Sequence, residues 1–271
     1  MSFAFPGDAS LDYFPCRYGR SKLLFRGPRR DLTAPYVAVL GSTETYGKFV
    51  PHPYPARLEA ALGLPVVNLG VPSAGPDAWG QDATLLDIAA KARVTVVQVT
   101  GAQNLTNRFY AVHPRRNDRF LRASPLLTQI FREVDFTDFH FTRHMLQSLR
   151  RVSPEKFALL ADELRAAWLV RMGALLPRLG PRVVLLWLAP NPAQDDAEPM
   201  LVDADMVMAL RPHVAASVTV TFSAEACAAG TAGMVFPSLA EPAARGMPGP
   251  LHHAEIAAAL APVLGPLFAR A

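Results

Sequence analysis

The strongest constraint on the fold is the alternation of short apolar runs with longer amphipathic segments along the chain. Five runs have the length and β-branched content of buried strands, at residues 35–42, 64–70, 94–104, 181–192 and 216–223. Helical spacing predicts helices at 54–63, 76–93, 124–152 (in pieces), 153–180, 203–214 and 252–271. Apolar strands without polar alternation, separated by helices, indicate a parallel sheet covered on both faces. The sequence therefore predicts a flavodoxin-like three-layer α/β/α sandwich with a mostly parallel five-stranded sheet.

The composition favours one large domain over residues 1–271. Hydrophobic residues make up 51% of the chain and charged residues 18%, which is enough for a sizeable core. Residues 1–34 are expected to form an N-terminal extension, and residues 105–152 an insertion after the third strand. We find no run of 18 apolar residues and no secretory signal, and Cys16 and Cys227 are the only cysteines. These features predict a cytoplasmic protein with reduced thiols.

The charge is weakly basic, with a formal net value of +4 carried mostly by arginine. Basic residues cluster in "RYGRSKLLFRGPRR" and "HPRRNDRFLR", which suits an anionic partner. No nucleic-acid-binding motif accompanies them, so we expect a small-molecule or glycan partner and neither nucleic acid nor membrane. His140 and His144 have helical i, i+4 spacing but lack the adjacent glutamate of a zinc protease, so no metal or cofactor is expected.

Polar residues follow the predicted strands at the edge where open α/β sheets place their sites. Ser42 follows the first strand, a Gly/Asn-rich turn at 68–77 the second, and Asn104 the third. His252 and His253 precede the closing helix. Together they provide a nucleophile, a base, and backbone N–H and amide donors for an oxyanion. The alternative is that Ser42 is only a turn residue or a helix N-cap.

These blocks resemble the SGNH (GDSL-like) hydrolase superfamily in order and spacing from about residue 35 onward. The matching segments are "LGST", "NLGVPSAG", "TGAQN" and "PGPLHH". The resemblance implies Ser42 as nucleophile and His253 (or His252) as base. It implies an oxyanion hole made by the Asn104 amide and a backbone N–H around Ser73–Gly75. The whole chain also resembles an uncharacterised alphaproteobacterial group with the same block order.

Three departures from the superfamily pattern bear on its activity. The usual Gly-Asp-Ser is Gly-Ser at Ser42, and the spacing of the third block lets Gln103 compete with Asn104. The aspartate expected three residues before the base is Pro250 or Gly249. A Ser-His dyad, or an acid from elsewhere such as Asp77, would then be required.

The insertion directly after Asn104 is expected to lie over the site. Arg115, Arg116 and Arg119 can clamp an anionic group, and Tyr110 can stack on a sugar or base. The first hypothesis is thus a serine esterase or acyltransferase that forms an acyl-enzyme on Ser42 and acts on a hydroxyl-rich or anionic ester. The alternative is a non-catalytic binding protein for an anionic saccharide or nucleotide on the same fold.

Overall fold

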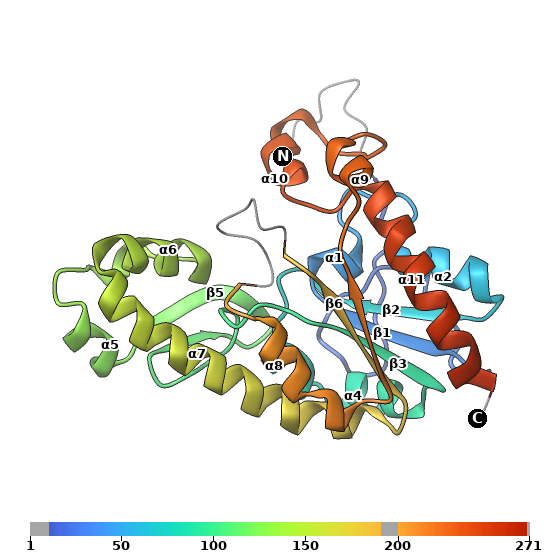
Figure 1. Ribbon diagram of the computed structural model, residues 1–271, viewed down its shortest axis with the longest axis horizontal. Coiled ribbons are helices and arrows are strands. Elements are labelled where there is room, and N and C mark those ends of the chain that lie inside the picture. Colours follow the sequence, from blue (N-terminus) through green and yellow to red (C-terminus); the bar gives the residue numbers. More distant parts are fainter. Residues whose placement is uncertain (1–10, 191–199, 270–271) are drawn as a thin grey trace.

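The computed structural model describes residues 11–190 and 200–269. Its central sheet has five parallel strands in the order β2-β1-β3-β6-β7. The strands are β1 (Val37–Gly41), β2 (Val66–Gly70), β3 (Val94–Gln98), β6 (Val183–Leu188) and β7 (Ala216–Val220). This order and direction confirm the predicted flavodoxin-like sandwich (Figure 1).

Both faces of the sheet are buried by helices. Because successive side chains of a strand point to opposite faces, they enter two different cores. Val37 and Val39 of β1 pack with α2 (Tyr54–Leu62) and α11 (Pro250–Ala269) on one face. Ala38 and Leu40 pack with α4 (Ala83–Lys91), α7 (Pro154–Leu175) and α8 (Ala204–Ala209) on the other. Figure 1 shows α2 and α11 on the side of the sheet away from α7.

Helix boundaries follow local capping chemistry. The predicted helix at 76–93 is divided into α3 (Pro76–Gly80) and α4, because the Asp82 side chain accepts a hydrogen bond from Leu85 N–H and starts a new helix. The predicted cap of the longest helix is confirmed, since Ser153 accepts from Lys156 N–H. That helix passes into η2 (Leu176–Leu179) and stops at Gly180, whose φ is 101°.

The insertion at 105–152 forms a lobe beside the sheet, which we call the insertion lobe (Figure 1). It contains an antiparallel pair that sequence periodicity did not predict, β4 (Tyr110–His113) and β5 (Arg116–Ala123). The predicted helical segment then breaks into α5 (Pro125–Ile130), η1 (Phe136–Asp138) and α6 (Thr142–Val152). A chain of aromatic contacts, Tyr110–Phe120–Phe136–Phe139, holds these elements together.

The remaining elements are short. They are α1 (Thr43–Tyr46), η3 (Arg211–His213), α9 (Ala224–Ala228), η4 (Ser238–Ala240) and α10 (Glu241–Arg245). Among the described residues, α11 alone is long and apolar enough to span a membrane. Its Ile256, Leu260 and Leu264 are buried against the sheet, as in the core helix of an α/β fold.

Candidate functional site

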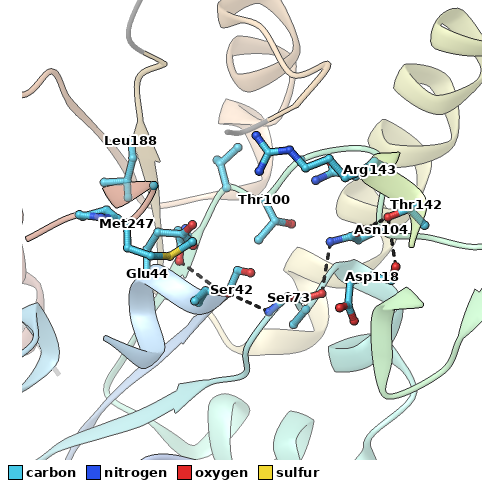
Figure 2. Close-up of a pocket in the computed structure, with 18 of the residues that line it drawn as sticks. Ser42, Glu44, Ser73, Thr100, Asn104, Asp118, Thr142, Arg143, Leu188 and Met247 are labelled. Carbon is cyan, nitrogen blue, oxygen red and sulfur yellow. Dashed lines mark hydrogen bonds between the residues drawn. The ribbon is translucent and has the colours of Figure 1, made fainter. Parts of the chain in front are cut away.

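A cavity of about 810 Å³ opens at the carboxyl ends of β1, β3 and β6, where parallel sheets commonly bind ligands. Its walls come from the sheet edge, the insertion lobe and the C-terminal segment. The polar and charged lining residues include Ser42, Glu44, Ser73, Gln98, Thr100, Asn104, Asp118, Thr142, Arg143, Arg245 and His252. Figure 2 shows Glu44 on one side of Ser42 and Ser73, with Asp118 and Arg143 on the other.

Ser42 lies where β1 turns into α1, as the sequence predicted. It occupies the N-cap position of α1, but its side chain makes no capping hydrogen bond. Its hydroxyl has no hydrogen-bond partner within residues 11–190 and 200–269 and faces the cavity. Gly41 precedes it because a Cβ there would clash with Thr45 Oγ1 and Gln98 Oε1.

Gln98, at the end of β3, organises this edge of the sheet. Its buried amide oxygen accepts from Ser42 N–H at 3.1 Å and from Thr45 Oγ1 at 2.6 Å. Its amide nitrogen donates to Glu44 Oε2 at 2.8 Å, which holds that carboxylate at the cavity wall. Gln98 therefore uses the Ser42 N–H that an oxyanion hole would need.

The turn after β2 also uses its backbone N–H groups in hydrogen bonds inside the protein. Ser73 N–H donates to Thr43 Oγ1 at 2.9 Å, and Gly75 N–H donates to Asn117 Oδ1 at 2.9 Å. Ala74 N–H donates to Val71 O at 3.1 Å. Ser73 lines the cavity, but every backbone donor from 73 to 75 already has an acceptor inside the protein.

Asn104 is positioned between the sheet edge and the insertion lobe. Its Nδ2 donates to Ser73 O at 3.3 Å, and its Oδ1 accepts from Thr142 Oγ1 at 2.7 Å (Figure 2). A carboxamide carries two N–H groups, so one amide hydrogen is left to face a ligand. Gln103, the alternative, lines the same cavity, and its backbone oxygen accepts from Tyr110 Oη at 2.7 Å.

The two histidines have different environments. His253 is 1% exposed and does not line the cavity. Its Nδ1 accepts from Tyr54 N–H at 3.0 Å, and its ring stacks on Tyr54. Burial above all lowers the pKa of His253 to about 3, helped by the nearby charge of His252. His253 is thus a neutral packing residue between α11 and α2.

His252 lies in the cavity wall at the start of α11. Its Nδ1 accepts from Gly249 N–H at 3.2 Å, and its ring meets Phe222 edge-on. Burial lowers the pKa of His252, and the charge of Glu255 opposes that shift only in part. A neutral imidazole whose Nδ1 accepts carries its proton on Nε2.

Other predicted site residues lie away from the cavity wall. Asp77 is 5% exposed and is bound by Arg171 Nε at 2.9 Å and Thr106 N–H at 2.9 Å. Tyr110 is buried in the insertion lobe, with its hydroxyl on Gln103 O. Asp77 is therefore not placed to orient either histidine, and Tyr110 is not placed to stack on a ligand.

The three arginines predicted to form a clamp lie outside the cavity wall. Arg115 and Arg116 are exposed at the β4–β5 turn, and Arg119 stacks over the Phe141 ring. None of the three lines the cavity, because the unpredicted hairpin carries them to the outside of the lobe. The arginines in the wall are instead Arg143 from α6 and Arg245 from α10.

Sequence reasoning also missed two carboxylates in the wall, Glu44 and Asp118. Burial raises the pKa of Asp118, and the charge of Arg116 opposes that shift. A signal existed for Glu44, which stands two residues after Ser42, but none existed for Asp118 without knowledge of the hairpin. Within the described residues, no cluster of three or more His, Cys, Asp or Glu side chains suits a metal ion.

A family model described as a domain of unknown function (DUF6473) matches residues 1–268. No curated protein matches the sequence. Among solved structures, the lipase Lip_vut3 from a goat rumen metagenome is similar over 84% of this chain and 96% of its own. Its sequence identity is 12% and its TM-score 0.35.

Proposed function

The chain belongs to the DUF6473 family of unknown function, and we propose that its cavity binds a small polyhydroxylated ligand with an anionic group, an acidic saccharide in chemical class. This is the binding alternative predicted from the sequence, at a differently composed site. The observation that carries it is the orientation of His252, whose Nδ1 accepts a hydrogen bond from Gly249 N–H.

That hydrogen bond is incompatible with a general-base role for His252. In a Ser-His-Asp triad, the carboxylate accepts from Nδ1–H and leaves the Nε2 lone pair to take the serine proton. Here a backbone donor occupies Nδ1, so Nε2 carries the proton and can only donate. His252 is therefore suited to donate a hydrogen bond to a ligand oxygen rather than to activate Ser42.

The backbone donors of an acyl-transfer site are likewise committed. The N–H groups of Ser42, Ser73 and Gly75 bond to Gln98, Thr43 and Asn117 respectively. An oxyanion hole needs preorganised donors aimed at the developing charge. Using these donors would first cost the internal hydrogen bonds that they now make.

The cavity offers a set of groups that suits sugar hydroxyls and one or two acidic substituents. Glu44 and Asp118 can accept from hydroxyl groups, and the Asn104 amide can donate. Thr100 Oγ1 is buried beside the cavity with no partner among the described residues, an uncompensated polar group that a ligand or water can satisfy. Arg143 supplies positive charge for a carboxylate or sulfate, and Arg245, which pairs with Glu241 at 2.6 Å, can donate a further hydrogen bond.

One observation favours a second candidate, acyl transfer through Ser42. The Ser42 hydroxyl has no partner among the described residues and shares the cavity with His252. A change of tautomer at His252, with the proton on Nδ1, would bring an Nε2 lone pair to the cavity. The leading and the second proposal differ in a direct chemical test, because only an activated serine reacts quickly with a fluorophosphonate.

The test is intact-mass measurement after fluorophosphonate treatment, with Ser42→Ala as control. Binding predicts no adduct on the folded wild type. A stoichiometric adduct that Ser42→Ala abolishes would reject the binding proposal in favour of acyl transfer.

Ligand binding is measured by saturation-transfer difference NMR, with galacturonate and its neutral counterpart galactose as probes. We expect signal from galacturonate that weakens in Arg143→Gln and persists in Arg150→Gln, a matched change on the same helix outside the cavity wall. Equal signals from both sugars in all three proteins would contradict the assigned anionic group.

A further inference from the structure

The positive charge of the protein is concentrated in the insertion lobe. Residues 105–152 contain nine arginines, no lysine and four acidic residues, a net charge of +5 against +4 for the whole chain. The rest of the chain is therefore close to neutral, and the basic character belongs to one lobe next to the cavity.

Few of these arginines form ion pairs, although the charges of Arg116 and Arg119 act on the pKa of Asp118. Arg108 pairs with Glu163 at 3.0 Å, and Arg143 belongs to the cavity wall. In the part of the chain that the structure describes, none of the other seven forms an ion pair with a carboxylate. Four of them lie on β5 and the turn before it, and we call them the arginine cluster: Arg115, Arg116, Arg119 and Arg122. Clustered like charges repel one another, so such a surface favours an anionic partner.

The arginine cluster is continuous with the cavity through one contact. The Arg119 guanidinium lies over the Phe141 ring, 4.5 Å from its centre, and the two residues form a β-bridge. Phe141 lines the cavity and is 42% exposed. A ligand that leaves the cavity over Phe141 therefore meets Arg119, and Arg116 and Arg122 lie three residues away on either side along β5.

We propose that the arginine cluster is an extended subsite for an acidic oligosaccharide whose terminal unit occupies the cavity. This inference rests on the proposed function, because the cavity supplies the terminal subsite. The Phe141 ring offers an apolar surface to a sugar face, and each guanidinium pairs with a carboxylate or sulfate on a following unit.

The chemistry of the cavity favours a saccharide over another polyanion. A DNA strand would bring to Glu44 and Asp118 a phosphate that they repel and few hydroxyl groups that can donate to them. A sugar chain presents hydroxyl groups to those carboxylates and carries acidic groups that the cluster can bind. The cavity has both carboxylates and arginines, whereas the cluster has arginines alone. This arrangement matches a ligand that carries both hydroxyl and acidic groups.

The test compares tetragalacturonate, galacturonate and neutral maltotetraose as probes for the full-length protein at low salt, roughly 20 mM NaCl, where surface charges are weakly screened. The variant is Arg115→Gln/Arg116→Gln/Arg122→Gln, at three exposed positions outside the cavity wall. The control Arg17→Gln/Arg20→Gln/Arg211→Gln removes equal charge from exposed positions elsewhere.

The variant is expected to bind tetragalacturonate about tenfold more weakly than wild type, on the order of twofold for each exposed charge pair lost. The variant should bind galacturonate as wild type does. The control variant should bind tetragalacturonate as wild type does. No binding of tetragalacturonate to wild type, or equal loss in variant and control, would overturn the subsite.

A dT8 oligonucleotide that binds as tightly as tetragalacturonate and with the same arginine dependence would overturn the saccharide assignment. An adduct at Ser42 with fluorophosphonate would instead overturn the proposed function. A failure of the cluster is thereby distinguished from a failure of the cavity assignment.

Discussion

We predict that a single substitution, Gly249→Asp, reverses the tautomer of His252 by moving its ring proton from Nε2 to Nδ1. A Cβ at position 249 would lie 3.9 Å from His252 Nδ1 and 3.0 Å from Gly230 O. The first distance places an aspartate carboxylate within reach of Nδ1. The second is tight, so a small local shift must accompany the substitution.

The energetic balance favours the reversal. A hydrogen bond to a charged carboxylate contributes about 1.5–3 kcal/mol, whereas the neutral Gly249 N–H bond that it replaces contributes about 0.5–1.5 kcal/mol. The carboxylate also raises the pKa of His252, because it stabilises the imidazolium. We therefore expect the proton to move from Nε2 to Nδ1 in Gly249→Asp.

The consequence is a gain of reactivity at Ser42. Correct orientation by an acid is worth about 10⁴ in kcat in triad enzymes, and a missing oxyanion donor costs about 10²–10³. With the backbone donors still committed, the net gain in fluorophosphonate labelling should be on the order of 10² at most. Gly249→Asn controls for size, and Gly249→Asp/Ser42→Ala for the site of labelling.

The assay pairs labelling rates with ¹⁵N–¹H correlation spectra of the histidine rings, which report which nitrogen carries the proton. An Nδ1–H tautomer for His252 in the wild type would refute the reasoning at its first step. A folded Gly249→Asp protein that adopts the Nδ1–H tautomer but labels no faster would refute the second step.

Three further predictions concern the support of the site. Arg26 donates hydrogen bonds to the Tyr46, Gly47 and Pro51 carbonyls behind α1. Arg26→Met should therefore lower the free energy of unfolding in urea by about 3 kcal/mol. Arg29→Met, at an exposed position, should change it by less than about 1 kcal/mol. Gln98→Leu removes the amide that bonds Ser42 N–H, Thr45 and Glu44, and should lower the free energy of unfolding in urea by about 2 kcal/mol. Because His253 has a folded pKa of about 3, below its unfolded value, its contribution to stability is complete above pH 6.5 and is lost as pH falls toward 3, at about 1.4 kcal/mol per pH unit. His253→Gln should flatten the dependence of unfolding free energy on pH between 6 and 4, and an unchanged slope would contradict the buried neutral ring.

Much of the architecture follows from local periodicity. The runs that became β1 and β6 are apolar at every position, and β3 is interrupted only by the buried Thr95 and Gln98; this pattern occurs where a strand is covered on both faces. Topology then brings Ser42, Ser73 and Asn104 to one edge, since the carboxyl ends of parallel strands meet there. The convergence of these three residues in one cavity was predictable for that reason.

The insertion lobe was not predictable in the same way. A two-stranded hairpin with mixed exposure has no clean alternation, and its register shifts between Ala111 and His113. From the sequence alone, Arg115 and Arg116 are predicted to reach the cavity, and no local pattern marks Asp118. Their actual positions depend on aromatic packing inside the lobe, which no local pattern encodes.

The sequence by itself determined the layered fold and which segments end at the ligand edge, because the burial pattern of each run and the alternation of strands with helices can be read along the chain. Only the tertiary structure decided the chemistry of that edge. His253 meets Tyr54 across 199 positions of chain, while adjacent His252 turns its Nδ1 toward Gly249 N–H. The protonation state and direction of a side chain depend on the donor or acceptor that packing brings against it, and this partner is set by the whole fold.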